Sequence, residues 1–221
     1  ALPDQDLSYV YDAAGNRIQT VENGVVTNYV TNGLNQYVSV DGASYTYDAD
    51  GNLIAKTQEG DQWTYIYDDE NQLIAIDGPD GAWTYEYDAL GNRVATVHGG
   101  VREEYVNDPL TYSIAQEYDA LGNSIATNFF GIGLVARADD AGNVNYFNTD
   151  RIGNVTGLSG PDGSLVSTYS YLLFGELVWI NETIDNAFRF SGGFGVTTEG
   201  NGFEFMRARY YDAAIGRFVS R

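Results

Sequence analysis

The sequence predicts an all-β fold in which antiparallel hairpins repeat along the chain and coil into a spiral or a shell. One motif, Tyr-x-Tyr-Asp-x-x-Gly-Asn, recurs several times, and the aspartates Asp48, Asp68 and Asp88 are 20 residues apart. Turn-forming pairs such as Asn23-Gly24 lie between the copies. A fixed period of this length indicates a repeat architecture, and the turn residues indicate hairpins.

The motif copies share a tyrosine followed by an aspartate, and most have a glycine three positions later. They are Tyr11, Asp12 and Gly15; Tyr47, Asp48 and Gly51; Tyr67 and Asp68; Tyr87, Asp88 and Gly91; and Tyr118, Asp119 and Gly122. Two related units, residues 29–32 and 105–108, lie on the same 20-residue step. Because a catalytic site needs one constellation of residues, a pair present in every unit is interpreted as structural: tyrosines packing across strands and aspartates capping turns.

A single unit, residues 45–67, shows what each period contains. Residues 45–47 alternate aromatic and small polar side chains, which is typical of a half-buried strand. Residues 48–52 form a turn, residues 53–57 a second strand, residues 59–61 a second turn, and residues 62–67 the next strand. Since tight turns join antiparallel neighbours, the chain is predicted to be one long meander.

From about residue 129 the motif loosens, but turn chemistry persists at Gly142-Asn143, Gly153-Asn154 and Asp162-Gly163. No segment is predicted to be a helix. Residues 172–179 are apolar enough for a helical turn, but Gly175 and the β-forming residues around it favour a strand.

The composition excludes several partners. The 221 residues carry a formal charge of −20, which argues against nucleic acid and anionic membranes. There is no cysteine, so no disulfide or thiolate chemistry is expected, and no apolar run is long enough to span a membrane. The chain lacks an initiator Met and begins almost at once in the repeat, so we expect a fragment or processed product of a longer array.

Candidate chemical sites are few. Asp48 and Asp50 resemble the start of a calcium loop. Glu59 is at the spacing that such a loop requires, but residues 53–58 are predicted to be a strand and not a loop. Solvated turn carboxylates are therefore the better interpretation. His98 is the only histidine, which disfavours a metal site or a triad. No catalytic residue, metal or cofactor is predicted. Trp63 and Trp83 occupy equivalent positions and are expected to line the interior, or else to form an outward aromatic row.

The C-terminal string is the most specific motif. It comprises Arg207, Arg209, Tyr210, Tyr211, Asp212, Gly216, Arg217 and Phe218. With this string and its Tyr-Asp copies, the chain resembles the Rhs/YD-repeat family over nearly its whole length. On that resemblance residues 1–128 are a YD-repeat hairpin array, and residues 129–221 are an Rhs repeat-associated core continuing the same sheet.

The resemblance implies a hollow YD-shell, a spiral β-barrel or cocoon, and a chain of this length is expected to form either a complete or an incomplete one. Such shells occur in bacterial Rhs toxins, ABC toxin complexes and teneurins. In the toxins they enclose a C-terminal effector that an aspartyl autoprotease cuts from the core. Its aspartates would lie beyond Arg221, so this chain is predicted not to be an enzyme. Arg221 matches the basic position before them and would be at most auxiliary.

Two functions follow as hypotheses. The first is a non-enzymatic scaffold, secreted or on a bacterial cell surface, that encapsulates an effector domain of its parent chain. The alternative is an extracellular structural or adhesion protein that self-assembles into filaments or larger particles. The expected partners are the effector domain, other protein subunits or further copies of this chain, and neither nucleic acid nor an inserted membrane.

Overall fold

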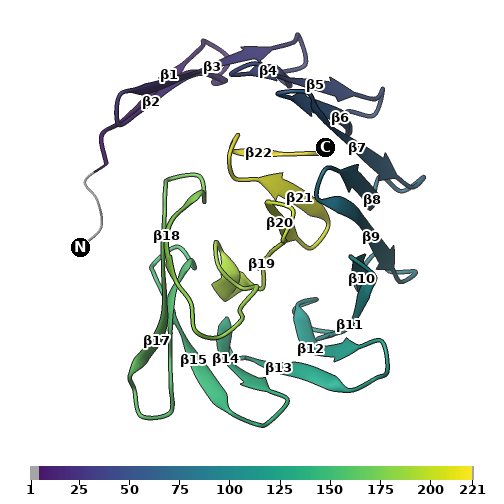
Figure 1. The fold of residues 1–221 in the computed structure, drawn as a ribbon, viewed down its shortest axis with the longest axis vertical. Helices are drawn as coiled ribbons and strands as arrows, with labels where there is room; N and C mark the ends of the chain where they lie inside the picture. Colours follow the sequence, from purple (N-terminus) through teal and green to yellow (C-terminus); the bar gives the residue numbers. More distant parts are fainter. Residues whose placement is uncertain (1–4, 221) are drawn as a thin grey trace.

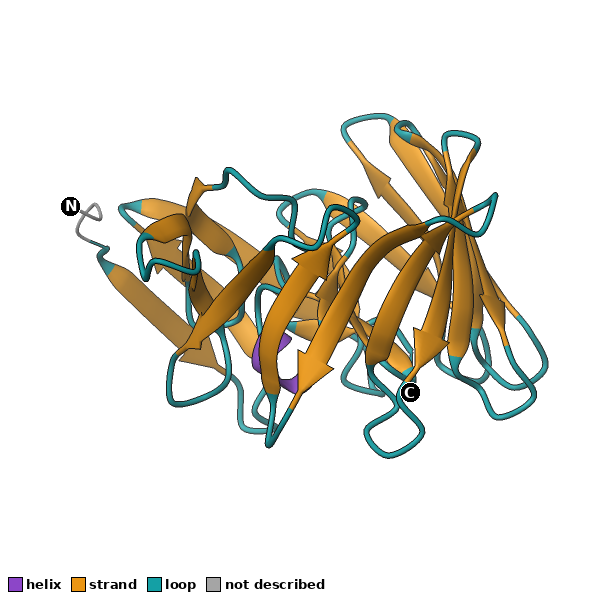
Figure 2. Ribbon diagram, turned by 90° about the horizontal axis from the view of Figure 1, so that it is seen from below, coloured by secondary structure: helices purple, strands orange, loops and turns teal. Residues whose placement is uncertain are grey.

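The computed structural model describes residues 5–220. It is all-β: a curved antiparallel meander surrounds a smaller sheet formed by the end of the chain (Figure 1). Seen from below, the strands of the curved sheet run side by side and their turns lie along two rims (Figure 2). The sequence prediction of an antiparallel hairpin meander is therefore confirmed.

The curved sheet has eighteen strands, and each strand from β1 to β17 pairs with the strand that follows it in the chain. The strands are β1 (Leu7–Tyr11), β2 (Arg17–Glu22), β3 (Val25–Thr31), β4 (Tyr37–Val40), β5 (Ala43–Tyr47), β6 (Leu53–Gln58), β7 (Asp61–Tyr67), β8 (Leu73–Gly78), β9 (Gly81–Tyr87), β10 (Arg93–His98), β11 (Val101–Asn107), β12 (Ile114–Asp119), β13 (Ser124–Phe130), β14 (Leu134–Asp139), β15 (Val144–Thr149), β16 (Val155–Ser159), β17 (Leu165–Tyr171) and β18 (Leu177–Asn181).

The remaining elements lie inside the curve. A 3-10 helix, η1 (Gly192–Phe194), is followed by an antiparallel sheet of β19 (Thr197–Thr198), β20 (Phe203–Met206), β21 (Arg209–Asp212) and β22 (Arg217–Phe218). The expectation that residues 129–221 continue the same sheet is thus wrong beyond Asn181. The chain turns inward there because the concave face is lined by aromatic side chains that need a second apolar layer.

A bulge recurs at the hairpins that carry the motif and helps to curve the sheet. In the β5–β6 pair the register shifts between Thr46 and Tyr47, and Tyr47 lies opposite Leu53. The β7–β8 and β9–β10 pairs shift at the equivalent positions. Since a bulge bends its strand and increases the local twist, its repetition accounts for the continuous curvature.

The motif does not keep to one rim. The turns that begin at Asp48, Asp68 and Asp88 each follow an odd-numbered strand, so they lie along the same rim. The turns at Asp119 and Asp139 follow the even-numbered strands β12 and β14, and therefore lie along the opposite rim. Asp119 follows Asp88 by 31 residues, about one and a half periods. Because half a period is one strand, the extra half period places the Asp119 turn on the opposite rim.

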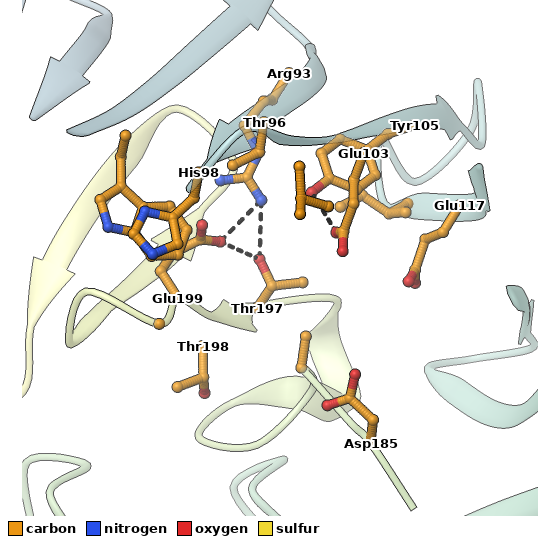
Figure 3. A pocket seen from close by; sticks show the side chains of 15 residues that line it. Arg93, Thr96, His98, Glu103, Tyr105, Glu117, Asp185, Thr197, Thr198 and Glu199 are labelled. Atoms are coloured by element: carbon orange, nitrogen blue, oxygen red, sulfur yellow. Dashed lines mark hydrogen bonds and ion pairs between the residues drawn. The ribbon is translucent and has the colours of Figure 1, made fainter. Parts of the chain in front are cut away.

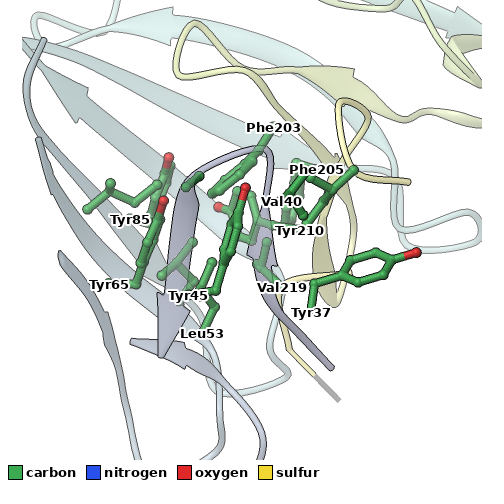
Figure 4. Close-up of a cluster of buried hydrophobic side chains, with 14 of the residues drawn as sticks. Tyr37, Val40, Tyr45, Leu53, Tyr65, Tyr85, Phe203, Phe205, Tyr210 and Val219 are labelled. Atoms are coloured by element: carbon green, nitrogen blue, oxygen red, sulfur yellow. The ribbon is translucent and has the colours of Figure 1, made fainter. Parts of the chain in front are cut away.

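The main core lies between the two sheets. Tyr45, Tyr65 and Tyr85 from the curved sheet contact the inner sheet, where Phe203 and Tyr210 pack against them (Figure 4). Two smaller clusters lie farther along the curve, one around Phe188 and the other around Leu158. The inner sheet therefore completes a core that the hairpins alone would leave exposed.

The curved sheet does not close on itself. Within the described residues β1 pairs only with β2 and β18 pairs only with β17, so each has one free edge. The C-terminal end lies inside the curve, whereas the described N-terminal end lies beside β1 at its outer boundary (Figure 1).

Candidate functional site

The motif aspartates bind the backbone of their own turns. Asp88 accepts hydrogen bonds from the backbone N–H groups of Leu90 and Asn92 at 2.9 Å each, and from Asn92 Nδ2 at 2.9 Å. Those bonds, led by the one from the Asn92 side chain, hold the pKa of Asp88 below its usual value. Asp12 and Asp119 make the same set of bonds. These carboxylates therefore organise turns and are exposed at the rims.

The acidic pairs do not form a metal site. Among residues 5–220 no three His, Cys, Asp or Glu side chains are placed to hold one ion. Asp50 and Glu70 lie at exposed turn positions, two residues after the capping aspartates Asp48 and Asp68. Their neighbours in the chain cap the backbone, which leaves no converging set of oxygen ligands.

The two tyrosines of a unit have different roles. Tyr45, Tyr65 and Tyr85 are buried in the main core. The second tyrosine of the unit is less buried and donates its hydroxyl to a backbone carbonyl: Tyr87 to Leu73 at 2.8 Å, and Tyr47 to Tyr37 at 3.0 Å. Burial raises the pKa of both Tyr47 and Tyr87 to about 12. Tyr11, near the free edge, is 48% exposed and has no comparable packing.

Trp63 and Trp83 line the interior, as the sequence indicated. Both pack against the main core. Lys56 lies over the Trp63 ring at 4.8 Å, and His98 stacks on Trp83 with ring centres 3.8 Å apart. His98 thus serves as an aromatic packing partner, and the tryptophans do not form an outward row.

The C-terminal string builds the inner sheet and locks it to the outer one. Tyr210 is 2% exposed and accepts a hydrogen bond from Arg93. Asp212 is buried, which raises the pKa of its carboxyl, and it accepts a bond from the Ala214 N–H at 3.0 Å. Unlike the rim aspartates, Asp212 caps a turn inside the core. The Gly216 N–H closes that turn by donating a hydrogen bond to the Asp212 backbone carbonyl.

The rest of the string makes contacts around this centre. Tyr211 donates to the Phe174 carbonyl at 3.0 Å, and Arg217 donates to Asn16 Oδ1 at 2.8 Å. Arg209 lies over the Phe218 ring at 3.8 Å. Arg207 donates to the Phe194 carbonyl at 3.0 Å. Arg221 lies outside the described residues.

Two buried arginines, which the sequence reasoning missed, connect the sheets. Arg93 is 2% exposed and forms an ion pair with Glu199 at 2.8 Å. Burial opposes its charge, but the Glu199 carboxylate outweighs this and holds the Arg93 pKa above its usual value. Arg17 is buried too and donates to the Ile215 carbonyl at 2.6 Å. Both follow a Gly-Asn pair at the first position of a strand, and that repeated position was the available signal.

A cavity of about 330 Å³ lies between β9–β12 and the segment that leads into the inner sheet (Figure 3). Its lining is strongly acidic, with four carboxylates, and includes the stacked Trp83 and His98 side chains. The acidic side chains are Glu103, Glu117, Asp185 and Glu199. Arg93 lies at one side of the cavity and meets Glu199 there.

The last described residues are held inside the hollow. Val219 is 2% exposed; its carbonyl accepts a bond from the Leu53 N–H at 2.8 Å, and its N–H donates to Tyr210. Tyr67 also donates its hydroxyl to the Val219 carbonyl at 3.3 Å. A polypeptide joined after this point would therefore start on the concave side of the sheet.

The family model described as Teneurin YD-shell matches residues 4–221. The chain belongs to this family. No curated protein matches it in sequence. In the described part of this YD-shell protein, no helix has the length and apolar character needed to cross a membrane.

Solved structures share its fold. The TcdB2-TccC3-Cdc42 structure is 16% identical with a TM-score of 0.56, and the match covers 98% of this chain and 16% of that one. TcdB2-TccC3 without its hypervariable C-terminal region is 14% identical with a TM-score of 0.55, at 98% and 16% coverage. The Photorhabdus luminescens Tc holotoxin pore is 14% identical with a TM-score of 0.54, at 98% and 15% coverage. The chain thus spans about one sixth of the solved chains that it matches.

Proposed function

We propose that this YD-shell protein is a non-enzymatic scaffold whose concave side encloses a polypeptide, and that this polypeptide is an effector domain joined after the C-terminal string. The observation that carries the proposal is the position of Val219, buried against β6 on the inside of the sheet. A chain continuing from there begins in the hollow and needs no crossing of the sheet to remain in it.

Other observations support a scaffold. The motif residues are engaged in turns and in the core, and the buried charged groups stabilise contacts between the sheets. One of the solved structures with this fold is a Tc holotoxin pore, which favours partner proteins for this chain. We further propose that the protein is secreted or displayed on a bacterial surface, and that neighbouring subunits close the open part of its shell.

Protease protection tests the proposal. An unstructured reporter peptide is fused after Arg221 in one version of the protein and before Ala1 in another. We expect cleavage of the C-terminal reporter to be about tenfold slower or more, because that reporter starts on the concave side, where the curved sheet limits the access of a protease. Equal cleavage rates for the two reporters would show that the hollow protects nothing.

The free edges of β1 and β18 favour a second candidate function, self-assembly. Unpaired edges are templates for pairing between chains, and Ile180 on β18 is 44% exposed beside such an edge. Light scattering over a range of concentrations measures the association. If edges drive it, Val10→Lys together with Ile180→Lys reduces the mass of the assemblies, whereas a protein that stays monomeric at every concentration removes this candidate.

A further inference from the structure

Only two of the four carboxylates around the acidic cavity are paired with an arginine. Glu199 pairs with Arg93 at 2.8 Å, and Glu117 receives Arg137 Nη2 at 2.9 Å. The other two, Glu103 and Asp185, form no ion pair with any cationic side chain of residues 5–220. Two carboxylates, the half-buried Glu103 and the exposed Asp185, therefore line the cavity without a counterion from the described part of the protein.

A buried hydroxyl in the same cavity lacks a hydrogen bond of normal geometry. Thr96 on β10 lies directly opposite Glu103 in the β10–β11 register, so the two side chains lie on the same face of the sheet. Thr96 is 6% exposed and lines the cavity; its Oγ1 interacts with the neighbouring Tyr105 hydroxyl but makes no hydrogen bond of normal geometry. Buried polar groups in folded proteins are nearly always paired, so this hydroxyl marks a position for a group that the chain does not supply.

The surroundings of the cavity also disfavour the ionised form of the Glu103 carboxyl. Its carboxylate accepts a bond from the Tyr105 hydroxyl at 3.2 Å. Burial raises the Glu103 pKa, and repulsion from Glu117, Asp185 and Glu199 adds to the rise. A cation placed beside Glu103 would relieve this repulsion and would be held by it.

The geometry selects the kind of cation. A compact metal ion needs several ligands at one point, and no three acidic or histidine side chains among the described residues converge in that way. A planar guanidinium or an ammonium carries several N–H donors that can reach separate acceptors. Aromatic rings favour such cations, and in this cavity the Arg93 guanidinium already lies 5.3 Å from the Tyr105 ring centre.

We propose that the acidic cavity binds a guanidinium or ammonium group, with Glu103, Asp185 and the Thr96 hydroxyl as its acceptors (Figure 3). In the shell this group is the side chain of an arginine or lysine in the enclosed polypeptide, and that assignment of the source rests on the proposed function. The cavity then acts as an anchor point that holds a basic segment against the concave face.

Titration of the intact protein with small probes tests the site. The probes are N-acetyl-arginine amide, its neutral isostere N-acetyl-citrulline amide, and agmatine, with calorimetry as the readout. We expect the arginine probe to bind and the citrulline probe not to bind. Glu103→Gln is expected to weaken the arginine probe about tenfold, because a charge-assisted bond becomes a neutral one. Glu70→Gln, which makes the same change at an exposed turn, leaves binding unchanged.

Amide NMR on the wild-type protein tests the same site without any substitution. In the wild-type protein, amide NMR shifts caused by the arginine probe should concentrate at residues 96, 103 and 185. Shifts spread over the acidic rims, equal binding of citrulline, equal effects of Glu103→Gln and Glu70→Gln, or no binding would each overturn the proposal.

The probes also separate the two sources of the cation. Stronger binding of N-acetyl-arginine amide, which carries a peptide backbone, than of agmatine supports a polypeptide ligand. Equal or stronger binding of agmatine supports the site but overturns the assignment to an enclosed chain. Because the protease experiment does not involve Glu103, encapsulation can fail while this site is retained, and the reverse also holds.

Discussion

At the scale of single residues, buried charges join the two sheets. Arg93 reaches from β10 to Glu199 and Tyr210, and Arg17 reaches from β2 to the Ile215 carbonyl. An ion pair of this kind gains little over an apolar pair, but removing one partner is costly because the other charge stays buried. These arginines therefore act as specific connections between segments far apart in the sequence.

Arg93→Met is expected to lower the free energy of unfolding by roughly 3–5 kcal/mol, since Glu199 would remain buried without its partner. The measurement is urea denaturation at neutral pH. Arg102→Met is the control, because the ion pairs of Arg102 with Glu86 and Glu104 are solvent-exposed and contribute little. Similar losses for both variants would contradict the structural role assigned to Arg93.

Glu204 makes stability depend on pH. Burial raises its pKa from 4.5 to about 7, and Thr198 donates a bond to it at 2.9 Å. The folded protein then binds more protons than the unfolded chain between these values. Stability from this group is present below about pH 4.5 and is lost as the pH rises to 7, by roughly 3 kcal/mol at most.

Unfolding at pH 5 and at pH 8 measures this effect. Glu204→Gln should remove the part of the decrease in unfolding free energy between pH 5 and pH 8 that Glu204 causes, because glutamine does not ionise. Glu70→Gln, at an exposed turn, should leave the decrease unchanged. A decrease of the same size in Glu204→Gln and in the wild-type protein would assign the pH dependence to other buried acids.

At the scale of the elements, each motif hairpin combines a capped turn with a bulge. Asp48 caps the β5–β6 turn through bonds from Asn52, and the register shift opposite Tyr47 leaves one extra residue on β6, just after the turn, which bends that strand. A meander of flat hairpins would not enclose a second sheet, and the repeated bulge provides the curvature. The same small device, used at successive hairpins, thereby shapes the whole outer wall.

Close strand contact at Gly157 gives a test at this scale. A Cβ there would lie 2.6 Å from the Ser167 carbonyl oxygen of β17, which is backbone and cannot move aside freely. Gly157→Ala is expected to cost roughly 1–3 kcal/mol. At Gly33 a Cβ meets nothing within 4 Å, so Gly33→Ala should be neutral or slightly stabilising. Equal effects in chemical denaturation would show that β16 and β17 tolerate separation.

At the scale of the whole molecule, the inner sheet makes the repeats into one cooperative unit. In a simple repeat array each unit contacts only its neighbours. Here Tyr210 contacts Tyr85 and hydrogen-bonds to Arg93, while Val219 bonds to Leu53. The end of the chain therefore stabilises strands from the first half.

Tyr210→Ala tests this coupling. It should lower stability by roughly 3–5 kcal/mol, as expected for removal of a large buried ring. Hydrogen exchange should increase in β5, β7 and β9 as well as in β21. Tyr146→Ala is the control, since Tyr146 is 46% exposed. Faster exchange confined to β19–β22 would show that the inner sheet unfolds independently.

Sequence reasoning was successful where the signal is local. The strand at residues 53–57 and the turn at 48–52 were predicted because alternation and turn residues act within a few positions. The 20-residue spacing of Trp63 and Trp83 predicted that they share one face of the sheet, and of the two faces left open the structure has the interior one. The burial of Arg17 and Arg93 was missed because a charged residue is expected at the surface unless its partner is known, and Glu199 is 106 residues from Arg93.

The sequence by itself determined the repeating strand and turn units, their antiparallel order and the membership of the motif residues in turns and core. Only the tertiary structure decided that residues 197–218 leave the outer sheet and pack against its concave side, because period-two alternation identifies a strand and not the sheet that it joins. It also decided that Glu103, Asp185 and Thr96 meet in one cavity, since the curvature of the wall brings distant segments together.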